Sequence, residues 1–248
     1  MQRIIKLARE GKRAFVALNL YKVIEPVNPF LMRLSFLSKQ AEWISHHQNL
    51  PFSDRGDPGL RHEKRYTLYQ YILAAERLDE AIDYLEFGVG HGHSFRWWIK
   101  HNRNPESRFV GFDTFTGLPE DWGVYKRGTF SSGGHPPEID DSRIQWVPGL
   151  FQDTLPGFLA TYSPTRRKLI HLDADMYSST LYVLTMLAPH LRQGDLLLFD
   201  EFGVPTHEFR AFTDFVSAYR IQYQVLGQVN NYLQVAIKLL ADPIPDKR

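Results

Sequence analysis

The sequence of 248 residues contains no cysteine, which excludes disulfide bonds, thiolate nucleophiles and thiolate metal sites. It also has no apolar run of the roughly eighteen residues that a membrane-spanning helix requires. No charge of one sign predominates, because 29 Lys and Arg stand against 28 Asp and Glu, so we expect no nucleic-acid partner. The opening residues have no signal-peptide core. These absences predict a soluble, cytoplasmic protein without an integral membrane segment.

The first 22 residues contain six basic residues and one acid, and apolar residues are interspersed among them. We favour a helix that packs on the core or that forms a homo-oligomer with a second subunit. A basic amphipathic helix on an anionic membrane surface is the less favoured alternative. Residues 49–60 are rich in Pro, Gly, Asp and Ser and predict a connector. We therefore expect an N-terminal helical extension with its connector over residues 1–58 and a main domain over residues 59–248.

In the main domain, hydrophobic runs of strand length alternate with helical patterns. This alternation predicts an α/β protein with a Rossmann-like, mostly parallel sheet and helices on both faces. Two runs around Asn230 and Asn231 predict a hairpin that adds an antiparallel C-terminal strand. Residues 114–142 are too long for a plain connector, and their glycines predict a lid over the bound ligands, with disorder as the alternative. Strands are expected at 81–87, 108–113, 143–147, 168–173, 195–200, 221–229 and 232–240, and helices at 61–78 and 94–102, around 181–191 and from Pro205.

The stretch "EFGVGHGHS" joins the first of these strands to a helix through glycines at positions 88, 90 and 92. Glycine permits positive φ and removes the Cβ atom that would keep a ligand away from the backbone. The spacing of a dinucleotide site fails, because His93 stands where the third glycine is required. Glu86 suits a cationic amino-acid group better than a pyrophosphate. A tight turn without a ligand is the alternative.

The next strand ends in Asp113, which is placed to hydrogen-bond the hydroxyls of a ribose. Phe112 and Phe115 flank this acid and can stack on an adenine or wall it off. Together with Glu86 and the glycines, these residues indicate an adenosine-containing cofactor without a pyrophosphate. S-adenosylmethionine fits this description.

Acids also follow two later strands, with Asp173 and Asp175 after one and Asp200 and Glu201 after the other. The carboxyl ends of neighbouring parallel strands meet at one edge of a sheet, where ligands bind. Close carboxylates raise one another's pKa values unless some stay protonated or a cation lies among them. Oxygen donors favour a hard ion, Mg²⁺ first and Ca²⁺ or Mn²⁺ as alternatives. Helix capping is the structural alternative, and we expect His171 to be a core residue.

Five ordered motifs resemble the macrocin O-methyltransferase-like (TylF-like) family of class I S-adenosylmethionine-dependent methyltransferases. The resemblance covers about residues 60–240 and implies a seven-stranded sheet with an antiparallel last strand. It also implies a Mg²⁺ ion that binds vicinal oxygens of a sugar-like acceptor. The family usually has Asp-Asp where this chain has Asp200-Glu201, and Glu still supplies an oxygen ligand. The motifs are "YLEFGVGHGHS", "GFDTFTGLPE", "GLFQDTLP", "HLDADMYSST" and "LLLFDEFG".

The same motifs imply roles for individual residues. Asp173, Asp200 and Glu201 fall at the metal-ligand positions, and Asp175, with Asp173 beside it, falls at the catalytic position as general base. The candidate cofactor-binding residues are Glu86, Gly88, Gly90, Gly92, Ser94, Asp113, Thr114, Phe115, Gln152 and Asp173.

The predicted function is therefore Mg²⁺-dependent O-methylation of a vicinal-diol hydroxyl on a small-molecule acceptor, a sugar or a glycosylated natural product. A catechol-type O-methyltransferase uses the same ion and the same diol geometry and is the nearest alternative. The glycine spacing disfavours an NAD(P)-binding Rossmann oxidoreductase. A non-catalytic binding module of the same fold would be expected to have lost some of the four carboxylates.

Overall fold

The computed structural model describes residues 1–54 and 59–244, and the chain divides into two compact units, Met1–Ser45 and His46–Arg248. Residues 52–53, within the segment predicted as extension and connector, pair with the sheet of the second unit. Among the residues that the structure describes, no helix has both the length and the apolarity needed to cross a membrane. The first unit contains α1 (Gln2–Ala17), α2 (Tyr21–Ile24), a 3₁₀ turn (Glu25–Val27) and α3 (Asn28–His46).

The second unit is built around an eight-stranded sheet in the order β1-β7-β8-β6-β5-β2-β3-β4. The C-terminal strand β8 runs antiparallel to β6 and β7, and the other neighbouring strands are parallel. This topology confirms the predicted fold class. The short β1 pairs with β7 and makes one strand more than the seven predicted. The strands are β1 (Phe52–Ser53), β2 (Ile82–Phe87), β3 (Arg108–Asp113), β4 (Ile144–Pro148), β5 (Arg167–Leu172), β6 (Leu196–Phe199), β7 (Tyr223–Val229) and β8 (Gln234–Leu239).

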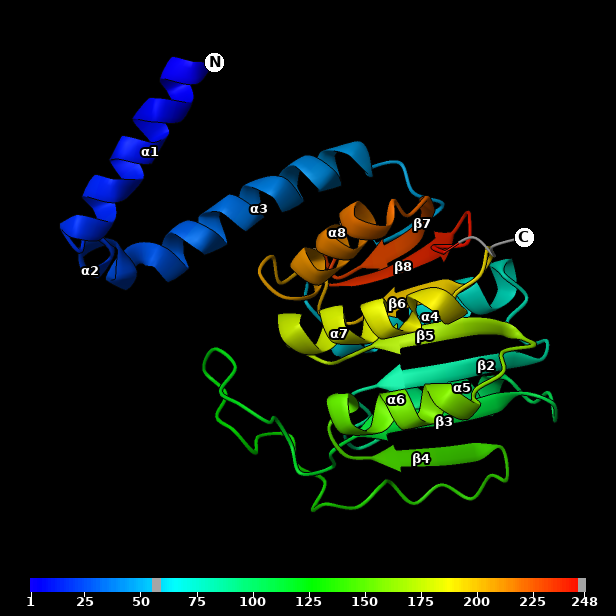
Figure 1. Cartoon of the computed structure of the whole chain (residues 1–248). Coiled ribbons are helices and arrows are strands. Elements are labelled where there is room, and N and C mark those ends of the chain that lie inside the picture. Colours follow the sequence, from blue (N-terminus) through cyan, green and yellow to red (C-terminus); the bar gives the residue numbers. More distant parts are fainter. Residues whose placement is uncertain (55–58, 245–248) are drawn as a thin grey trace. The chain divides into compact units, whose positions relative to one another are not determined.

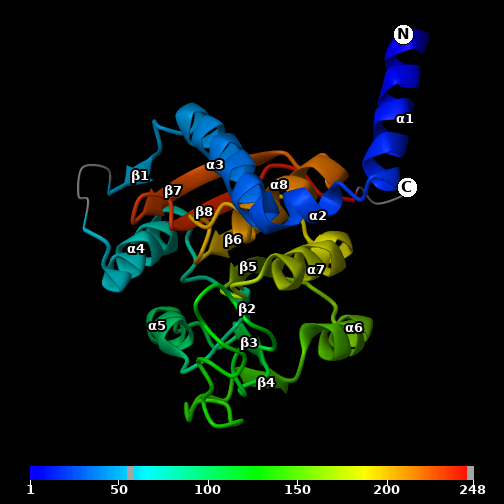
Figure 2. The same ribbon diagram turned by 90° about the vertical axis from the view of Figure 1, so that its left-hand side faces the viewer.

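Helices cover both faces of this sheet (Figure 1). Figure 2 shows α4 and α5 on one face, and α6, α7 and α8 on the other. Helix α8 begins three residues after Pro205, which lies in the preceding turns. Helix α6 was not predicted, because Pro156 and Gly157 interrupt its helical pattern. The bounds are α4 (Arg65–Ala75), α5 (His93–His101), α6 (Phe151–Thr161), α7 (Tyr177–Leu187) and α8 (Glu208–Tyr219).

Large aromatic side chains fix the first face of the sheet. Tyr69 of α4, Trp98 of α5 and Tyr84 of β2 are fully buried. The ring of Trp98 lies 5.3 Å from that of Tyr69 and 5.8 Å from that of Tyr84, measured between centroids. Buried rings of this size contribute strongly to the hydrophobic stabilisation of a core. This packing holds α4 and α5 against β2, from whose carboxyl end the glycine turn begins.

Candidate active site

A cavity of about 920 Å³ lies at the carboxyl ends of the parallel strands. Its volume matches that of a small-molecule site, which typically measures about 300–1,000 Å³. Most of the residues predicted for the site line it, including the four strand-end acids. Gly92 and Phe115 do not. Phe115 is buried and its ring packs edge-on against Trp146, so the predicted stacking on an adenine finds no support from this residue.

The glycine turn approaches the strand-end loop of β5 at Gly88. Gly88 has φ of 95°, and a Cβ atom on it would lie 1.8 Å from the carbonyl oxygen of Asp173. The next glycine, Gly90, donates its N–H to Oδ2 of Asp113 at 2.7 Å. Oδ1 of Asp113 accepts the N–H of Phe115 at 2.7 Å. These two bonds hold the Asp113 carboxylate in place at the cavity wall.

We predict that Gly88→Ala lowers the free energy of unfolding by about 2–5 kcal/mol, because the new methyl group would overlap the backbone of Asp173. Gly90→Ala is the matched control. Gly90 has φ of 50° and no atom within 4 Å of its Cβ position, so strain alone should cost about 1–2 kcal/mol. Urea unfolding of both variants measures the difference, and equal losses would contradict the predicted backbone contact.

A buried chain of polar groups lies behind the glycine turn. The Tyr84 hydroxyl donates to Oε2 of Glu86 at 2.5 Å and lies 2.8 Å from Nδ1 of His171. The Tyr69 hydroxyl lies 3.1 Å from Oγ of Ser94 and 3.4 Å from Nε2 of His171. Burial lowers the pKa of His171 to about 3, so its imidazole is neutral. His171 is thus a buried histidine of the core, as predicted, and the sequence analysis missed its two tyrosine partners.

The four strand-end acids have pKa values above their ordinary range. Burial, with the charges of Asp200 and Asp113, raises the pKa of Asp175 to about 7. Burial, with the charges of Asp200 and Asp175, raises the pKa of Glu201 to about 8. The pKa of Asp173 is raised well above its ordinary value by burial and by the Asp200 and Asp175 charges. Burial also raises the pKa of Asp200. Close, poorly hydrated carboxylates of this kind favour a cation among them.

Part of this cluster has the spacing of a metal site. One ligand atom from each of His171, Asp173 and Asp200 lies within 4.8 Å of the others. Oδ1 of Asp200 is buried and has no hydrogen-bond partner among the described residues. Glu201 lines the same cavity without belonging to this closest group. The oxygen donors and the unpartnered Oδ1 fit a hard divalent cation.

Asp175 has an unusual backbone conformation. Its φ is 57°, in the left-handed region that residues other than glycine rarely adopt. The turn around it is closed by a hydrogen bond from the N–H of Met176 to the carbonyl of Ala174 at 2.5 Å. Strained residues of this kind cluster at functional sites. The carboxylate itself lines the cavity.

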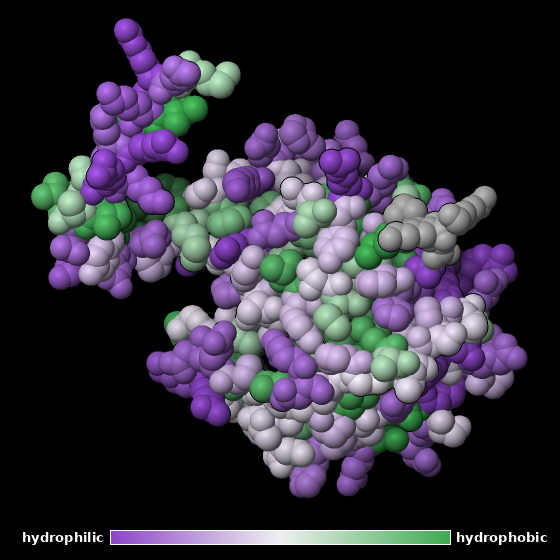
Figure 3. Space-filling view, viewed as in Figure 1, coloured by the Kyte–Doolittle hydropathy of each residue, from purple (hydrophilic) through white to green (hydrophobic). Residues whose placement is uncertain are grey.

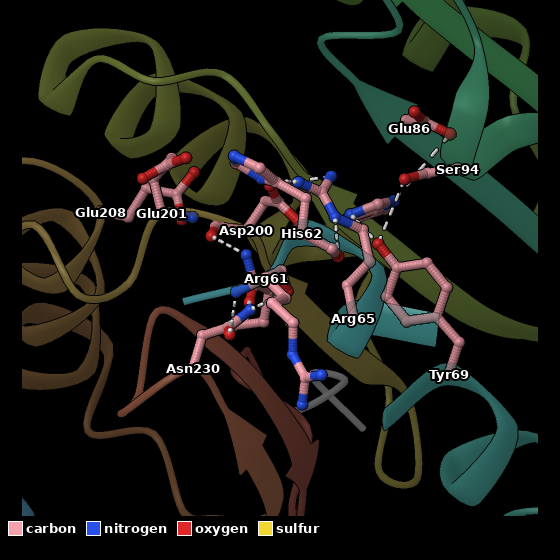
Figure 4. Close-up of polar contacts among 12 residues, drawn as sticks. Arg61, His62, Arg65, Tyr69, Glu86, Ser94, Asp200, Glu201, Glu208 and Asn230 are labelled. Carbon is pink, nitrogen blue, oxygen red and sulfur yellow. Dashed lines mark hydrogen bonds and ion pairs between the residues drawn. The ribbon is translucent and has the colours of Figure 1, made fainter. Parts of the chain in front are cut away.

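An arginine that the sequence analysis missed lies against the acids. Nη1 of Arg65 is 3.1 Å from Oδ2 of Asp200, with the two side chains only 15% and 3% exposed. Nε of Arg65 donates to the carbonyl of His62 at 3.1 Å. Figure 4 shows Arg65 and Tyr69 on one side of Asp200. No local signal in the sequence marks this residue, because an arginine at the start of a helix is usually solvated.

A buried glutamate on the other side of Asp200 was also missed. Glu208 is fully buried, and its Oε2 accepts the N–H of Glu201 at 2.8 Å (Figure 4). Its Oε1 has no hydrogen-bond partner among the described residues. Burial and the Glu201 charge raise the pKa of Glu208 well above its ordinary value, which favours the protonated form. Glu208 therefore holds the backbone of Glu201 in place.

We predict that Arg65→Gln lowers the free energy of unfolding by about 3–5 kcal/mol at neutral pH, because it leaves the buried Asp200 carboxylate without its partner. Arg77→Gln is the matched control. Arg77 pairs with Glu80 on the exposed surface, where an ion pair contributes about 0–1 kcal/mol. Denaturant titration in EDTA measures both variants. A loss below about 1 kcal/mol in Arg65→Gln would contradict the pairing.

The loop over residues 114–142 is held together by backbone hydrogen bonds within the loop. The N–H of Leu118 donates to the carbonyl of Thr129, and the N–H of Gly128 donates to that of Leu118, both at 2.9 Å. Beyond these, the rings of Trp122 and Tyr125 stack with centroids 5.4 Å apart and planes 16° apart. Both rings line the cavity. The loop therefore adds an aromatic wall to the cavity.

The sheet with its antiparallel C-terminal strand, the glycine turn and the acids at the strand ends define a Rossmann-like fold of the methyltransferase type. The model of the macrocin O-methyltransferase (TylF) family matches residues 136–233. Over these residues the resemblance predicted from the sequence motifs is confirmed.

Two curated relatives are O-methyltransferases by name. One is 8-demethyl-8-(2,3-dimethoxy-alpha-L-rhamnosyl)-tetracenomycin-C 4'-O-methyltransferase of Streptomyces olivaceus, 36% identical over 36% of this chain and 31% of that protein. The other is mycinamicin III 3''-O-methyltransferase of Micromonospora griseorubida, 32% identical over 44% of this chain and 42% of that protein. The chain thus aligns with less than half the length of each of these relatives.

Solved structures share the fold of a large part of this chain. The calicheamicin methyltransferase CalS11 matches with a TM-score of 0.57 and 25% identity, over 72% of this chain and 80% of that chain. The O-methyltransferase NovP matches with a TM-score of 0.56 and 19% identity, over the same shares of the two chains. The apo structure of CalS11, titled TDP-rhamnose 3'-O-methyltransferase, matches with a TM-score of 0.52 and 25% identity, covering 72% of this chain and 81% of that one.

Proposed function

We propose that the protein is an S-adenosylmethionine-dependent, divalent-ion-dependent O-methyltransferase that acts on a vicinal-diol hydroxyl of a sugar or of a glycosylated natural product. The observation that carries this proposal is the contact between Gly88 and the backbone of Asp173. Through this contact the glycine turn and the acid cluster form adjacent walls of one cavity. A methyl donor and an acceptor bound to these two walls would be neighbours.

The glycine-turn side of the cavity suits the cofactor. S-adenosylmethionine supplies a methyl group on a positively charged sulfur. Asp113 would accept hydrogen bonds from the ribose hydroxyls, since its carboxylate is held by the N–H groups of Gly90 and Phe115. Glu86 would take the cationic amino-acid end, and Ser94, Thr114 and Gln152 line the same space.

The acid cluster suits the chemistry on the acceptor. Asp173 and Asp200 would hold the divalent ion, with Glu201 as the proposed third ligand, and His171 remains occupied by its tyrosine partners. A bound divalent ion lowers the pKa of an acceptor hydroxyl and fixes its direction. Asp175 would take the proton from that hydroxyl as general base. The walls of the cavity would align the acceptor oxygen with the methyl group for an in-line displacement.

The loop over residues 114–142, the predicted lid, favours a sugar as the acceptor. Stacked aromatic rings such as those of Trp122 and Tyr125 offer flat faces on which the C–H face of a pyranose can pack. Phe130 lines the same side of the cavity. The names of two relatives add a second argument, because one is named for a substrate that contains a rhamnosyl group and CalS11 is titled a TDP-rhamnose methyltransferase. A deoxyhexose is therefore the acceptor class to test first.

The experiment is a methyl-transfer assay with methyl-labelled S-adenosylmethionine and Mg²⁺ against a panel of rhamnosides, other glycosides and catechols. We expect label on the glycosides that carry adjacent hydroxyls. Label on catechols alone would assign the protein to the catechol type. The absence of label on every acceptor, with S-adenosylmethionine binding also absent by calorimetry, would contradict the proposal.

A further inference from the structure

Helix α1 has a continuous apolar stripe along one side. Residues at helical spacing share this side, whereas Lys6, Arg9 and Arg13 lie opposite it and Arg3 and Lys12 border it. Ile5, Val16 and Ala17 are the apolar residues of α1 that fall outside the stripe. In Figure 3, hydrophobic and strongly hydrophilic side chains lie beside one another on this helix. The stripe consists of Ile4, Leu7, Ala8, Gly11, Ala14, Phe15 and, just past the helix end, Leu18.

The apolar stripe is open to solvent. Ile4, Leu7 and Leu18 are 74%, 73% and 68% exposed, and no residue of α1 is buried. An exposed apolar stripe along a whole helix indicates a binding surface, because isolated surface residues would not align in this way.

Charge is distributed unevenly between this segment and the rest of the chain. Six of the 29 basic residues and one of the 28 acids fall in residues 1–22. The remaining residues therefore contain 23 bases and 27 acids. A chain that is nearly neutral as a whole thus has strongly basic residues 1–22, which include α1, and a net acidic remainder. Such an asymmetry favours a partner that is anionic and contacts the first helix alone.

We propose that α1 lies in the plane of an anionic membrane surface, with its apolar stripe among the lipid chains and its basic residues at the headgroups. Arg3 and Lys12 border the stripe, where long basic side chains can reach the phosphates while their stems stay in the apolar layer. A helix of 16 residues is about 24 Å long, which is too short to span a bilayer. When the helix lies along the surface, its apolar stripe contacts the lipid chains and its basic residues contact the headgroups.

The basic residues of α1 argue against a second copy of the helix, and its apolar stripe argues against a nucleic acid, as the binding partner. If two copies of α1 paired through their stripes, the bordering residues Arg3 and Lys12 of both helices would be brought together, and Glu10 is the single acid within α1 that could offset them. A nucleic acid would satisfy the basic residues and leave the apolar stripe in water. An anionic lipid surface complements both properties at once. This docking is independent of the proposed methyl transfer.

The test is flotation of the full chain with vesicles of phosphatidylcholine alone and of phosphatidylcholine mixed with phosphatidylglycerol. We expect binding to the mixed vesicles only, weakening as salt is added. Arg3→Gln with Lys12→Gln, the two residues that border the stripe, should weaken this binding at least about tenfold. Lys100→Gln with Arg103→Gln, an exposed pair on another helix end, is the matched control and should bind as the unaltered protein does.

Three results would overturn the proposal. The first is failure to bind the mixed vesicles, and the second is equal weakening by the two charge pairs. The third concerns the double variant Ile4→Ser with Leu7→Ser. We expect this variant to lose flotation and to keep its thermal unfolding midpoint, since neither side chain is buried. If that variant instead lowers the midpoint or converts a dimer to a monomer by light scattering, the stripe contacts protein and not lipid.

Discussion

Asp173→Asn should reduce kcat by roughly 10²–10⁴-fold while the dissociation constant of S-adenosylmethionine stays within about tenfold of its original value. The side chain of Asp173 belongs to the closest group of ligand atoms, and asparagine offers the ion no negative charge. The contact with Gly88 uses the Asp173 carbonyl, which the substitution leaves in place. Donor binding should therefore survive the loss of turnover.

The same variant should not be less stable than the original protein in EDTA. The pKa of Asp173 is raised well above its ordinary value by burial and by the neighbouring acids, so its charged form is disfavoured when no ion is bound. A neutral amide relieves the repulsion from the neighbouring acids. Asp153→Asn, an exposed acid in the first turn of α6, is the matched control and should change neither turnover nor stability. Full activity in Asp173→Asn would contradict the assigned role.

Asp175→Asn is expected to lower kcat by about 10²–10⁴-fold through a different cause, the loss of the general base. Asp175 lines the cavity and lies outside the closest group of ligand atoms. Affinity for the divalent ion and for S-adenosylmethionine should therefore stay within about tenfold of the original values, measured by calorimetry on the folded variant. Asp173→Asn removes a charged ligand of the ion, whereas Asp175→Asn should leave ion affinity unchanged. Comparing ion binding in the two variants therefore distinguishes the general base from the ion ligand.

A parallel loss of ion affinity in Asp175→Asn would make this residue a ligand and remove it as the base. Asp175→Gly offers an additional control, because the residue has a φ of 57° that glycine adopts without strain. If turnover falls equally in the Asn and Gly variants, the carboxylate is the cause. If only the Asn variant loses activity, the cause is a changed backbone conformation of the turn and not the loss of the carboxylate.

Much of the fold could be predicted from the sequence because its signals are local. A strand buried on both faces, such as β2, β5 or β6, requires a continuous apolar run, and each such run in the sequence became a strand. The antiparallel last strand followed from the turn at Asn230 and Asn231. The short β1 was missed because two residues are too few to show the alternating pattern of a strand. Helix α6 was missed because Pro156 interrupts its helical spacing of apolar residues.

The candidate site could be predicted only in part, because some of its residues have no local signal in the sequence. Acids at strand ends converge by topology, so the sequence located Asp113, Asp173 and Asp200 at one cavity. The partners that surround them come from distant segments whose own patterns look ordinary. Arg65 reaches Asp200 across 135 positions of sequence, and Tyr84 reaches His171 across 87. Only the packed tertiary structure brings such pairs together.

The central claim is that the carboxylate cluster holds a divalent ion required for methyl transfer to an adjacent sugar hydroxyl. The most direct measurement follows labelled methyl transfer to a rhamnoside in Mg²⁺, then in EDTA, then in EDTA with excess Mg²⁺. We predict transfer in Mg²⁺, its loss in EDTA and its recovery when the ion is restored. Transfer that continues unchanged in EDTA would contradict the claim.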